Sequence, residues 1–582
     1  MTEFEWAIED IYASEKEFDA DVKRAEELCD FSEFKGKLSD KKVFLDCMKK
    51  QERAGRIIEK LSVYAMMRFD TDTSSSEYDA LNKKAEALAV KFGEQVAFVT
   101  PELISLDESV INGYIADREL KEYDYFLKQL LNEKAHVLGE NEERLLALSS
   151  ETLSSFHDIF TKIDNADLPL KSFRHGGKVY ELSHGAYGVI MRNSDRKLRE
   201  KCYKEYYGAY GSLLNTISAT YSASVKKDVF LARARNYPSA LEKALLSEDV
   251  SPVVYENLIS GVKKALPLMH RYMKVKKKEL GLKTMRMYDV YVPTASDYEI
   301  ELTYDKAYDL VVDALSVFGD EYKNLLIKAK KERWLSVFET KNKRSGAYSV
   351  CVYDTHPFVL LNYKKTTHDV FTIAHEMGHS IHSYFSNKNQ PYAKADYKIF
   401  VAEVASTVNE TLLIKYLLKN AKDAKLKKYL LYYLLEMIRT TLFRQTQFAE
   451  FEEAVHSAAE KGIPLTKDYM SDLYGKLNEK YYGKAIKPDD LIKTEWARIP
   501  HFYRAFYVYK YATGIISALS ISDRILNEGE TAVNDYFKFL SSGGSDSPVE
   551  LLKIAGVDLT KPDAFDSAFK VFKDALEEYE KL

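Results

Sequence analysis

The chain contains few of the residues that interrupt helices or cross-link a fold. Its 582 residues include only 24 glycines, 13 prolines and 4 cysteines. Because glycine and proline are scarce while Lys, Glu, Leu and Ala are abundant, the composition favours long helices joined by few tight turns. The four cysteines show no pair spacing, which indicates neither a disulfide framework nor a cysteine metal site and favours a reducing, cytoplasmic location.

A strong net charge and a membrane-length apolar run are also absent. The formal net charge is −5 at pH 7, too mild to indicate a nucleic acid or a membrane surface as partner. No stretch approaches the roughly 18 uninterrupted apolar residues of a membrane span. The first residues, MTEFEWAIEDIYASEKEF, are acidic and broken by charges, unlike a signal peptide. We expect no nucleic-acid or membrane partner, and no obligate protein partner is evident.

The length and the texture of the chain predict more than one domain. Apolar residues make up 46% and charged residues 30%, which is typical of a globular protein with a large core. A chain of this length is too long for a single compact core. Residues 1–165 read as consecutive amphipathic helices, whereas a glycine-containing stretch at 165–200 breaks the pattern. We therefore expect a helical domain of residues 1–190 and a second domain of residues 191–582.

A β-hairpin is predicted shortly before the most unusual stretch of the sequence. GAYSVCVY (346–353) and FVLLNY (358–363) are β-branched and aromatic runs that flank the turn sequence DTHP. The second run leads through KKTT into a helix, for which Thr366 and Asp369 form a plausible capping pair.

That helix contains TIAHEMGHSIHSYF (372–385), which places three of the twelve histidines within eight positions. One side is apolar, and the histidines occupy another side. His375 and His379, at i and i+4, can direct two imidazoles at one metal ion, with Glu376 alongside as a base. The alternative is coincidence in a helix-rich chain.

A third metal ligand would decide between these two interpretations. The metzincin pattern requires Gly at 382 and His at 385, but the chain has His382 and Phe385. The other option is a carboxylate on the next helix, where Glu403 lies among apolar residues. A cation would compensate such a carboxylate, and the alternative is a side chain that reaches solvent. Glu410, seven residues on along the same face, could hold a ligand histidine in place from behind.

These stretches resemble a known family. HEMGHSIH, FVAEVASTVNE, KRSGAY, YDTHPFVLLN, SHGAYGVIMRNSDRKLRE and WARIPHFYRAFYVYKYATG are similar to oligoendopeptidase F of the thimet-oligopeptidase-like zinc metallopeptidases. The resemblance implies a mostly α, two-lobed fold with a deep substrate channel and a small β-hairpin next to the zinc-binding helix. It makes residues 191–582 the catalytic domain.

Carried over residue by residue, the resemblance makes His375, His379 and Glu403 the ligands of one zinc ion and Glu376 the catalytic base. His382 is then a residue that supports the site or packs beneath it. The same ligand types accept cobalt or manganese, so those metals stay open.

Donors for the developing oxyanion are expected from IPHFYRAFYVYKYATG. Tyr503, Tyr507 and Tyr511 recur every four residues, which predicts a tyrosine stripe on one helical face. For a generic chain, an aromatic core stripe is the alternative. The resemblance instead implies that His501, Tyr507 and Tyr511 act over the zinc and that Tyr503 contacts substrate.

The hairpin is expected to bind substrate. A strand edge beside the metal helix could pair with an extended peptide backbone. Arg344, Gly346, Ala347 and Tyr348 match a glycine-containing loop of the family, although this chain has a single glycine there. His356 stands where the resemblance implies Asn, and the sequence offers no reason for the change.

We thus expect a cytoplasmic zinc endopeptidase that cuts internal bonds of short, unstructured peptides. One alternative is a dipeptidyl carboxypeptidase of the same family, which would need a positive group to hold the substrate's C-terminus. The other is a helical interaction protein whose metal site is structural or empty.

Overall fold

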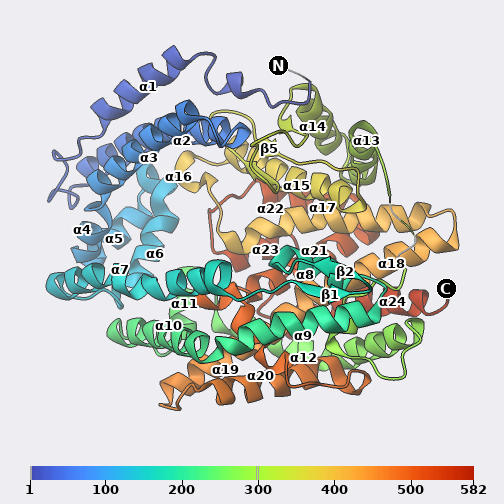
Figure 1. The fold of residues 1–582 in the computed structure, drawn as a ribbon. Coiled ribbons are helices and arrows are strands. Elements are labelled where there is room, and N and C mark those ends of the chain that lie inside the picture. Colours follow the sequence, from blue (N-terminus) through green and yellow to red (C-terminus); the bar gives the residue numbers. More distant parts are fainter. Residues whose placement is uncertain (1–2, 296–297, 299) are drawn as a thin grey trace. The chain divides into compact units, whose positions relative to one another are not determined.

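Figure 1 shows the fold as a computed structural model, which describes residues 3–295, 298 and 300–582. Helices dominate, and the sheets within these residues have two and three strands. The expectation of a mostly α fold is confirmed. The chain forms two compact units, each from three segments: Met1–Val137, Glu299–Leu417 and Ile521–Asp558 make unit 1, while Leu138–Tyr298, Leu418–Ser520 and Leu559–Leu582 make unit 2. Residues 1–190 contribute to both units, and the division at residue 190 stays a prediction.

Unit 1 contains the small three-stranded sheet and the histidine-bearing helix. Its helices are α1 (Glu15–Leu28), α2 (Lys41–Thr71), α3 (Ser76–Val96), α4 (Val99–Ser105), α5 (Glu108–Ala116), α6 (Asp124–Lys134), α13 (Tyr304–Leu315), α14 (Asp320–Lys331), α15 (Thr367–Asn389), α16 (Tyr392–Ala395), α22 (Glu530–Leu540) and α23 (Pro548–Ile554). Its strands are β3 (Leu335–Ser336), β4 (Tyr348–Val350) and β5 (Phe358–Leu360). Helix α17 (Ile399–Asn420) belongs to this unit except for its last three residues.

Unit 2 contains the C-terminal tyrosine-rich segment. Its helices are α7 (Glu140–Lys162), α8 (His184–Met191), α9 (Arg196–Ser212), α10 (Leu214–Ala234), α11 (Ala240–Ser247), α12 (Pro252–Glu279), α18 (Ala424–Ile438), α19 (Arg444–Glu460), α20 (Lys467–Tyr482), α24 (Asp566–Tyr579) and most of α21 (Tyr509–Glu528). A short hairpin, β1 (Phe173–His175) with β2 (Lys178–Tyr180), interrupts these helices.

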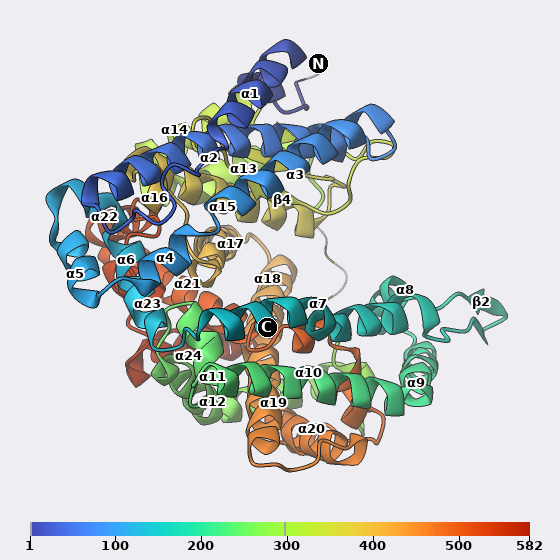
Figure 2. The same ribbon diagram turned by 90° about the vertical axis from the view of Figure 1, so that its left-hand side faces the viewer.

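Helices α2 and α3 run side by side and support the hairpin of unit 1 (Figures 1 and 2). The Asp40 side chain caps α2 by accepting hydrogen bonds from two backbone N–H groups of the first turn, which satisfies donors that a helix start leaves unpaired. Behind α2, Leu61 and Tyr64 join Phe358 and Leu360 of β5 in one buried apolar cluster. The apolar face of the N-terminal helices thus fixes the position of the sheet.

The predicted hairpin is present. Strand β4 pairs antiparallel with β5, with Tyr348 opposite Leu360 and Val350 opposite Phe358. Strand β3 adds in parallel on the other side of β5, so the order is β3-β5-β4 and β4 lies at an edge. All three residues of β5 are buried, as expected for the central strand of a sheet packed against helices.

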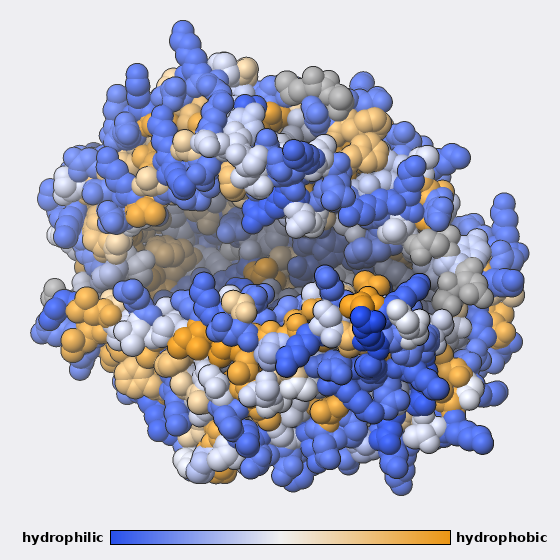
Figure 3. All heavy atoms as spheres, viewed as in Figure 1, coloured by the Kyte–Doolittle hydropathy of each residue, from blue (hydrophilic) through white to orange (hydrophobic). Residues whose placement is uncertain are grey.

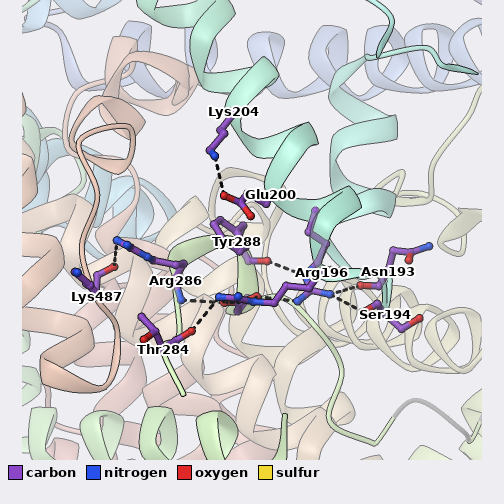
Figure 4. A network of polar contacts seen from close by, with 11 residues as sticks. Asn193, Ser194, Arg196, Glu200, Lys204, Thr284, Arg286, Tyr288 and Lys487 are labelled. Carbon is purple, nitrogen blue, oxygen red and sulfur yellow. Dashed lines mark hydrogen bonds and ion pairs between the residues drawn. The ribbon is translucent and has the colours of Figure 1, made fainter. Parts of the chain in front are cut away.

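Two arginines of the segment RNSDRKLRE (192–200), Arg196 and Arg199, take part in a buried ionic network of unit 2 (Figure 4). Asp289 is fully buried and accepts hydrogen bonds from Arg196 Nε at 3.0 Å and Arg199 Nη2 at 2.8 Å. The backbone N–H of Arg286 donates to the same carboxylate at 2.9 Å. Because a buried carboxylate is stable only when fully paired, the start of α9 and the segment at 284–289 are held together by these contacts.

The surface is mainly hydrophilic on the face that Figure 3 shows, with hydrophobic residues in small patches. Within the described part of the chain, no helix combines the length and the apolar character that a membrane span requires.

Asp289→Asn should lower the free energy of unfolding by about 3 kcal/mol, because it leaves two guanidinium groups facing a neutral amide in a buried site. Glu200→Gln is the matched control, since Glu200 pairs with Lys204 at an exposed position, where loss of a pair costs under about 1 kcal/mol. Urea denaturation of both variants measures the difference. Equal unfolding midpoints would show that the network does not stabilise unit 2.

Candidate metal centre

Helix α15 begins with the capping pair that the sequence predicts. The Thr366 side chain accepts from the Asp369 backbone N–H at 3.2 Å, and the Asp369 side chain accepts from the Thr366 backbone N–H at 2.8 Å. This reciprocal pairing satisfies two donors at the helix start. The predicted apolar stripe is also present, since its four members are fully buried: Val370, Ala374, Met377 and Ile381. The apolar stripe sets the rotation of the helix and leaves the histidines on another face.

Helices α15 and α17 cross in direct backbone contact at Gly378. A Cβ atom on Gly378 would lie 2.6 Å from Ser406 Cα and 2.7 Å from the Ala405 carbonyl oxygen, closer than real Cβ atoms come to backbone. The crossing is fastened by Asn409, whose side-chain amide donates to the Ala374 carbonyl at 3.0 Å. The absence of a side chain at Gly378 therefore permits the two helices to approach.

The crossing brings together the three predicted metal ligands. His375 Nε2 lies 3.2 Å from His379 Nε2, and Glu403 Oε2 lies 3.4 Å and 3.6 Å from these two nitrogens. In a tetrahedral site with bonds near 2.0–2.1 Å, neighbouring ligand atoms are separated by about 3.3–3.5 Å. The separations therefore fit one small divalent ion. Among the described residues, this is the one group of three His, Cys, Asp or Glu side chains with such geometry.

Two further side chains orient the predicted ligands. The Nδ1 of His375 forms a hydrogen bond with Glu410 Oε1, so the imidazole presents Nε2 toward the cluster when Nδ1 carries the proton. Ser406 Oγ donates to Glu403 Oε2 at 3.2 Å. Glu410 thus lies behind the ligand histidine, where the sequence places it.

The electrostatic environment of the cluster favours a cation. Burial alone would lower the pKa of His375, but the hydrogen bond and charge of Glu410 raise it to about 9. Burial would raise the pKa of Glu403, but the hydrogen bond and charge of His379 lower it to about 2. Glu376 is only 7% exposed, and burial raises its pKa. Three carboxyl groups around two imidazoles create a site that a divalent ion can neutralise.

His382 packs beneath the site. It is 1% exposed, and its ring stacks on Tyr397 with centroids 3.8 Å apart and meets Phe539 at 5.3 Å. Burial lowers the pKa of His382 to about 3, so the ring is neutral near pH 7. Of the two roles left open by the sequence, packing agrees with this position.

The loop before β4 is anchored by a buried aspartate. Asp70 of α2 accepts from Arg344 Nη1 at 3.0 Å and from Tyr348 Oη at 2.8 Å. Gly346 has φ of +91°, a backbone conformation that suits glycine, and Ala347 follows it. The polar groups of Arg344 and Tyr348 therefore hold the loop on α2. A substrate role for these four loop residues stays a prediction.

Strand β4 also contacts α15, the helix that carries the two histidines of the cluster. Ser349 Oγ and Ser380 Oγ are hydrogen-bonded at 2.8 Å, which ties the edge strand to α15.

The DTHP turn is fixed by His356. Its Nε2 lies 2.9 Å from Asp10 Oδ2, and its ring stacks on Trp334 with centroids 5.0 Å apart. These contacts supply the reason for a histidine at position 356 that the sequence did not offer.

The predicted continuous tyrosine stripe is wrong. Pro500–Tyr503 forms a short 3-10 helix, α21 begins only at Tyr509, and Phe506 between them has φ of +55°. A left-handed residue ends helical hydrogen bonding, so the four-residue spacing does not define one face. Tyr503 is 7% exposed and stacks on Phe160 with centroids 4.4 Å apart. Its enclosure by the rings of unit 2 gives it a packing role and does not support the predicted substrate contact.

His501, Tyr507 and Tyr511 do form a cluster on unit 2. Tyr511 Oη lies 3.4 Å from His501 Nε2, and the Tyr507 ring stacks on His501 with centroids 6.1 Å apart. Partial burial and the guanidinium groups of Arg444 and Arg504 lower the pKa of His501. The ring is therefore neutral near pH 7, with one N–H to donate.

The turn at Phe506 is held by Glu452, a residue that the sequence did not single out. Glu452 of α19 is fully buried, and its Oε1 accepts from the backbone N–H of Phe506 at 3.1 Å. Burial raises the pKa of Glu452 well above its usual value, which favours the protonated carboxyl group. The available signal was helical spacing: of the three glutamates in FAEFEEAVH (448–456), Glu452 lies four residues after Phe448 and three before Val455, on the apolar face of α19. Glu452 fixes the strained Phe506 and thereby the adjacent Tyr507.

A helix with HExxH beside a second helix that supplies a carboxylate defines a class of metal-dependent peptidases. Comparison with known proteins is more specific. The profile of Peptidase family M3 matches residues 189–571, and that of Oligopeptidase F matches residues 102–169. The chain belongs to peptidase family M3, whose members are metallopeptidases, and its resemblance to oligoendopeptidase F is confirmed.

Individual relatives are similar over nearly the whole chain. The sequence is 41% identical to oligopeptidase PepF of Bacillus subtilis, covering 99% of this chain and 87% of that protein. It is 40% identical to group B oligopeptidase PepB of Streptococcus agalactiae, covering 100% and 97%. The crystal structure of oligoendopeptidase-F from Enterococcus faecium superposes with a TM-score of 0.73 at 35% identity, covering 97% of both chains. A Chlamydophila abortus structure reaches 0.94 at 37% identity, covering 100% and 98%.

Gly378→Ala should destabilise unit 1 by about 1–3 kcal/mol, because the added methyl group clashes with the backbone of α17. Separating the helices also moves Glu403 away from the histidines, so affinity for divalent metal should fall. The matched control is Gly93→Ala on α3, where a Cβ meets nothing within 4 Å. Thermal unfolding and a cobalt titration measure both effects. Unchanged cobalt affinity in Gly378→Ala would contradict the role of the close crossing.

Glu452→Gln should become more stable relative to wild type as pH rises above about 4.5. The pKa of Glu452 in the folded protein is raised above its usual value of 4.5, which applies to the unfolded chain. Between these two pKa values the unfolded chain loses a proton that the folded protein keeps. The free energy of unfolding of wild type therefore falls there by about 1.4 kcal/mol per pH unit. Urea denaturation at pH 5, 6, 7 and 8 gives the difference in free energy of unfolding between the two proteins. The titration of all other groups is common to both proteins and cancels in this difference. A difference independent of pH would show that Glu452 is ionised in the fold. Glu452→Leu, which leaves the Phe506 N–H unpaired, should lose about 1–3 kcal/mol.

Proposed function

We propose that this protein is a zinc-dependent endopeptidase that hydrolyses internal bonds of short, unstructured peptides. The observation that carries the proposal is a set of three ligand atoms that lie 3.2–3.6 Å apart: His375 Nε2 and His379 Nε2 of α15 and Glu403 Oε2 of α17. Helix α15 also carries the buried Glu376. Family membership and relatives named oligopeptidase or oligoendopeptidase support the substrate class.

His375, His379 and Glu403 would hold the single zinc ion. Two imidazoles and one carboxylate are a donor set typical of catalytic zinc sites, which keep a further position open. When bound, zinc supplies a Lewis acid that polarises a carbonyl group and lowers the pKa of water. Glu410 keeps the His375 imidazole in the orientation that directs Nε2 at the ion.

Glu376 would move the proton. Its carboxyl group follows the first ligand histidine directly in sequence, and burial raises its pKa toward the working pH. A carboxylate with a raised pKa is a stronger base than an ordinary glutamate, so it accepts a proton from the attacking water more readily. The protonated carboxyl group then returns that proton to the departing amine nitrogen. Correct placement of such a group typically contributes about 10²–10⁴ in rate.

His501, Tyr507 and Tyr511 would donate hydrogen bonds to the oxyanion. All three can donate in their neutral forms, and the turn that carries Tyr507 is held by Glu452. Removal of one such donor typically costs about 10²–10³ in turnover. Support for this role comes from the family resemblance and from the clustering of the three side chains on unit 2.

The edge of β4 would bind the peptide backbone. The strand is fixed to α15 through Ser349 and Ser380 and lies at the edge of its sheet. Pairing with backbone groups gives affinity without a strict demand on side chains. Arg344, Gly346, Ala347 and Tyr348 would shape the approach to this edge.

The family match favours this function over a non-catalytic interaction protein and does not favour a dipeptidyl carboxypeptidase. The cysteines are free, in agreement with a reducing compartment, and the cytoplasmic location stays a prediction.

Glu376→Gln should retain metal and lose at least about 10²-fold in kcat, because it removes the base and leaves the ligands in place. Glu403→Gln should instead lose metal affinity, since it removes a charged ligand. Glu321→Gln, an exposed side chain that faces Lys388, is the control. Metal content by mass spectrometry and cleavage of a quenched peptide separate the cases. If Glu376→Gln keeps its metal and cuts as fast as wild type, the catalytic assignment is wrong.

A further inference from the structure

A small pocket lies against Tyr507 within unit 2. Its volume is about 330 Å³, and its walls come from α10, α11 and the turn between Tyr503 and Lys510. Six charged side chains line it, four of them positive: Lys227, Lys243, Arg504 and Lys510, with Asp228 and Glu248. The lining therefore has a formal charge of +2, since four positive groups face two negative ones.

Two of the positive groups are already neutralised by the acids of the pocket. Lys510 Nζ donates to Glu248 Oε1 at 2.7 Å, and Lys227 Nζ lies 3.0 Å from Asp228 Oδ1. For Lys243 and Arg504, by contrast, no carboxylate of the described residues lies within 4.0 Å. The excess positive charge therefore belongs to these two side chains.

Lys243 has a negative charge nearby, that of Asp228, but no ion pair with it or with another carboxylate of the described residues. Burial lowers the pKa of Lys243, the charge of Asp228 offsets this only in part, and the smaller effects of Arg235 and Lys227 lower it further. Removing an ammonium group from water without a partner costs free energy. A bound anion would restore the missing interaction, whereas a neutral ligand would not.

Tyr507 connects the pocket to the cluster of oxyanion donors. The Arg504 guanidinium lies 4.4 Å from the centre of the Tyr507 ring, and Lys510 Nζ lies 5.2 Å from it. The same ring stacks on His501. One aromatic side chain thus borders both the positive pocket and the histidine, so an anion held in the pocket lies next to the turn that carries the donors.

We propose that this pocket is a subsite for a carboxylate of the peptide substrate, with Lys243 and Arg504 as its principal contacts. The inference rests on the proposed endopeptidase function. Lysine supplies a compact charge, and arginine supplies a planar pair of N–H donors that suits a carboxylate. A volume at the lower end of the range for ligand pockets accommodates a chain end or one acidic side chain.

The test uses three quenched peptides of identical length: one with a free C-terminal carboxylate, one with a C-terminal amide, and one with that amide and a glutamate beside it. For the peptide with the free carboxylate, the peptide with the added glutamate, or both, we expect wild type to show a kcat/KM about 10-fold higher than for the simple amide. This is the size expected for one charge-assisted contact. The three peptides distinguish a terminal carboxylate from an acidic side chain.

Lys243→Met should abolish that preference by raising KM for the acidic peptide, with kcat unchanged, because the contact is equal in ground and transition states. Lys243→Arg should keep most of it. Lys264→Met, an exposed lysine of α12 outside the pocket, should leave it intact. Equal kcat/KM of wild type for all three peptides, or an unchanged preference in Lys243→Met, would overturn the proposal.

Binding separates this proposal from the catalytic one. Calorimetric titration of Glu376→Gln with the same peptides should give a Kd about 10-fold lower for the carboxylate peptides, and the Lys243→Met change should remove the difference. Absence of cleavage by wild type together with this Kd difference would refute the endopeptidase function while supporting the subsite. Cleavage without any Kd difference would refute the subsite alone.

Discussion

The close crossing of α15 and α17 is the constraint on which the candidate centre depends. The HExxH sequence brings two imidazoles together on one helix, but the third donor comes from another helix, and its position depends on how near the two backbones come. Gly378, inside the motif itself, allows contact with Ser406, and Asn409 fastens the crossing to the Ala374 carbonyl. Helix packing at normal side-chain distance would leave Glu403 too far away to complete the set.

Within each unit, buried polar side chains serve as structural ties and keep their hydrogen bonds inside the protein. Asp70 binds Arg344 and Tyr348, and Asp289 binds Arg196 and Arg199. In each case one buried carboxylate joins segments that are far apart in the sequence. Such groups are costly to bury alone and stable when every oxygen is paired, so they favour one arrangement of the loops over others.

Features set by local spacing could be predicted from the sequence. The i and i+4 histidines, the Thr366 capping pair, the hairpin and the carboxylate at Glu403 follow from periodicity and residue type. Features set by distant contacts could not. Tyr348 meets Asp70 across 278 positions, and Phe506 takes a left-handed conformation because Glu452 binds it across 54. Nothing in the tyrosine spacing indicates that break, and the three-segment composition of each unit has no local signal either.

The place of β4 at the edge of its sheet carries a consequence for selectivity. A strand edge offers unpaired amide and carbonyl groups, which only a chain with free backbone groups of its own can satisfy. The backbone of a folded protein is already hydrogen-bonded within its own helices and sheets. If the β4 edge binds substrate as proposed, its discrimination would be conformational: the degree of folding of the substrate, more than its residues, would determine whether it can dock.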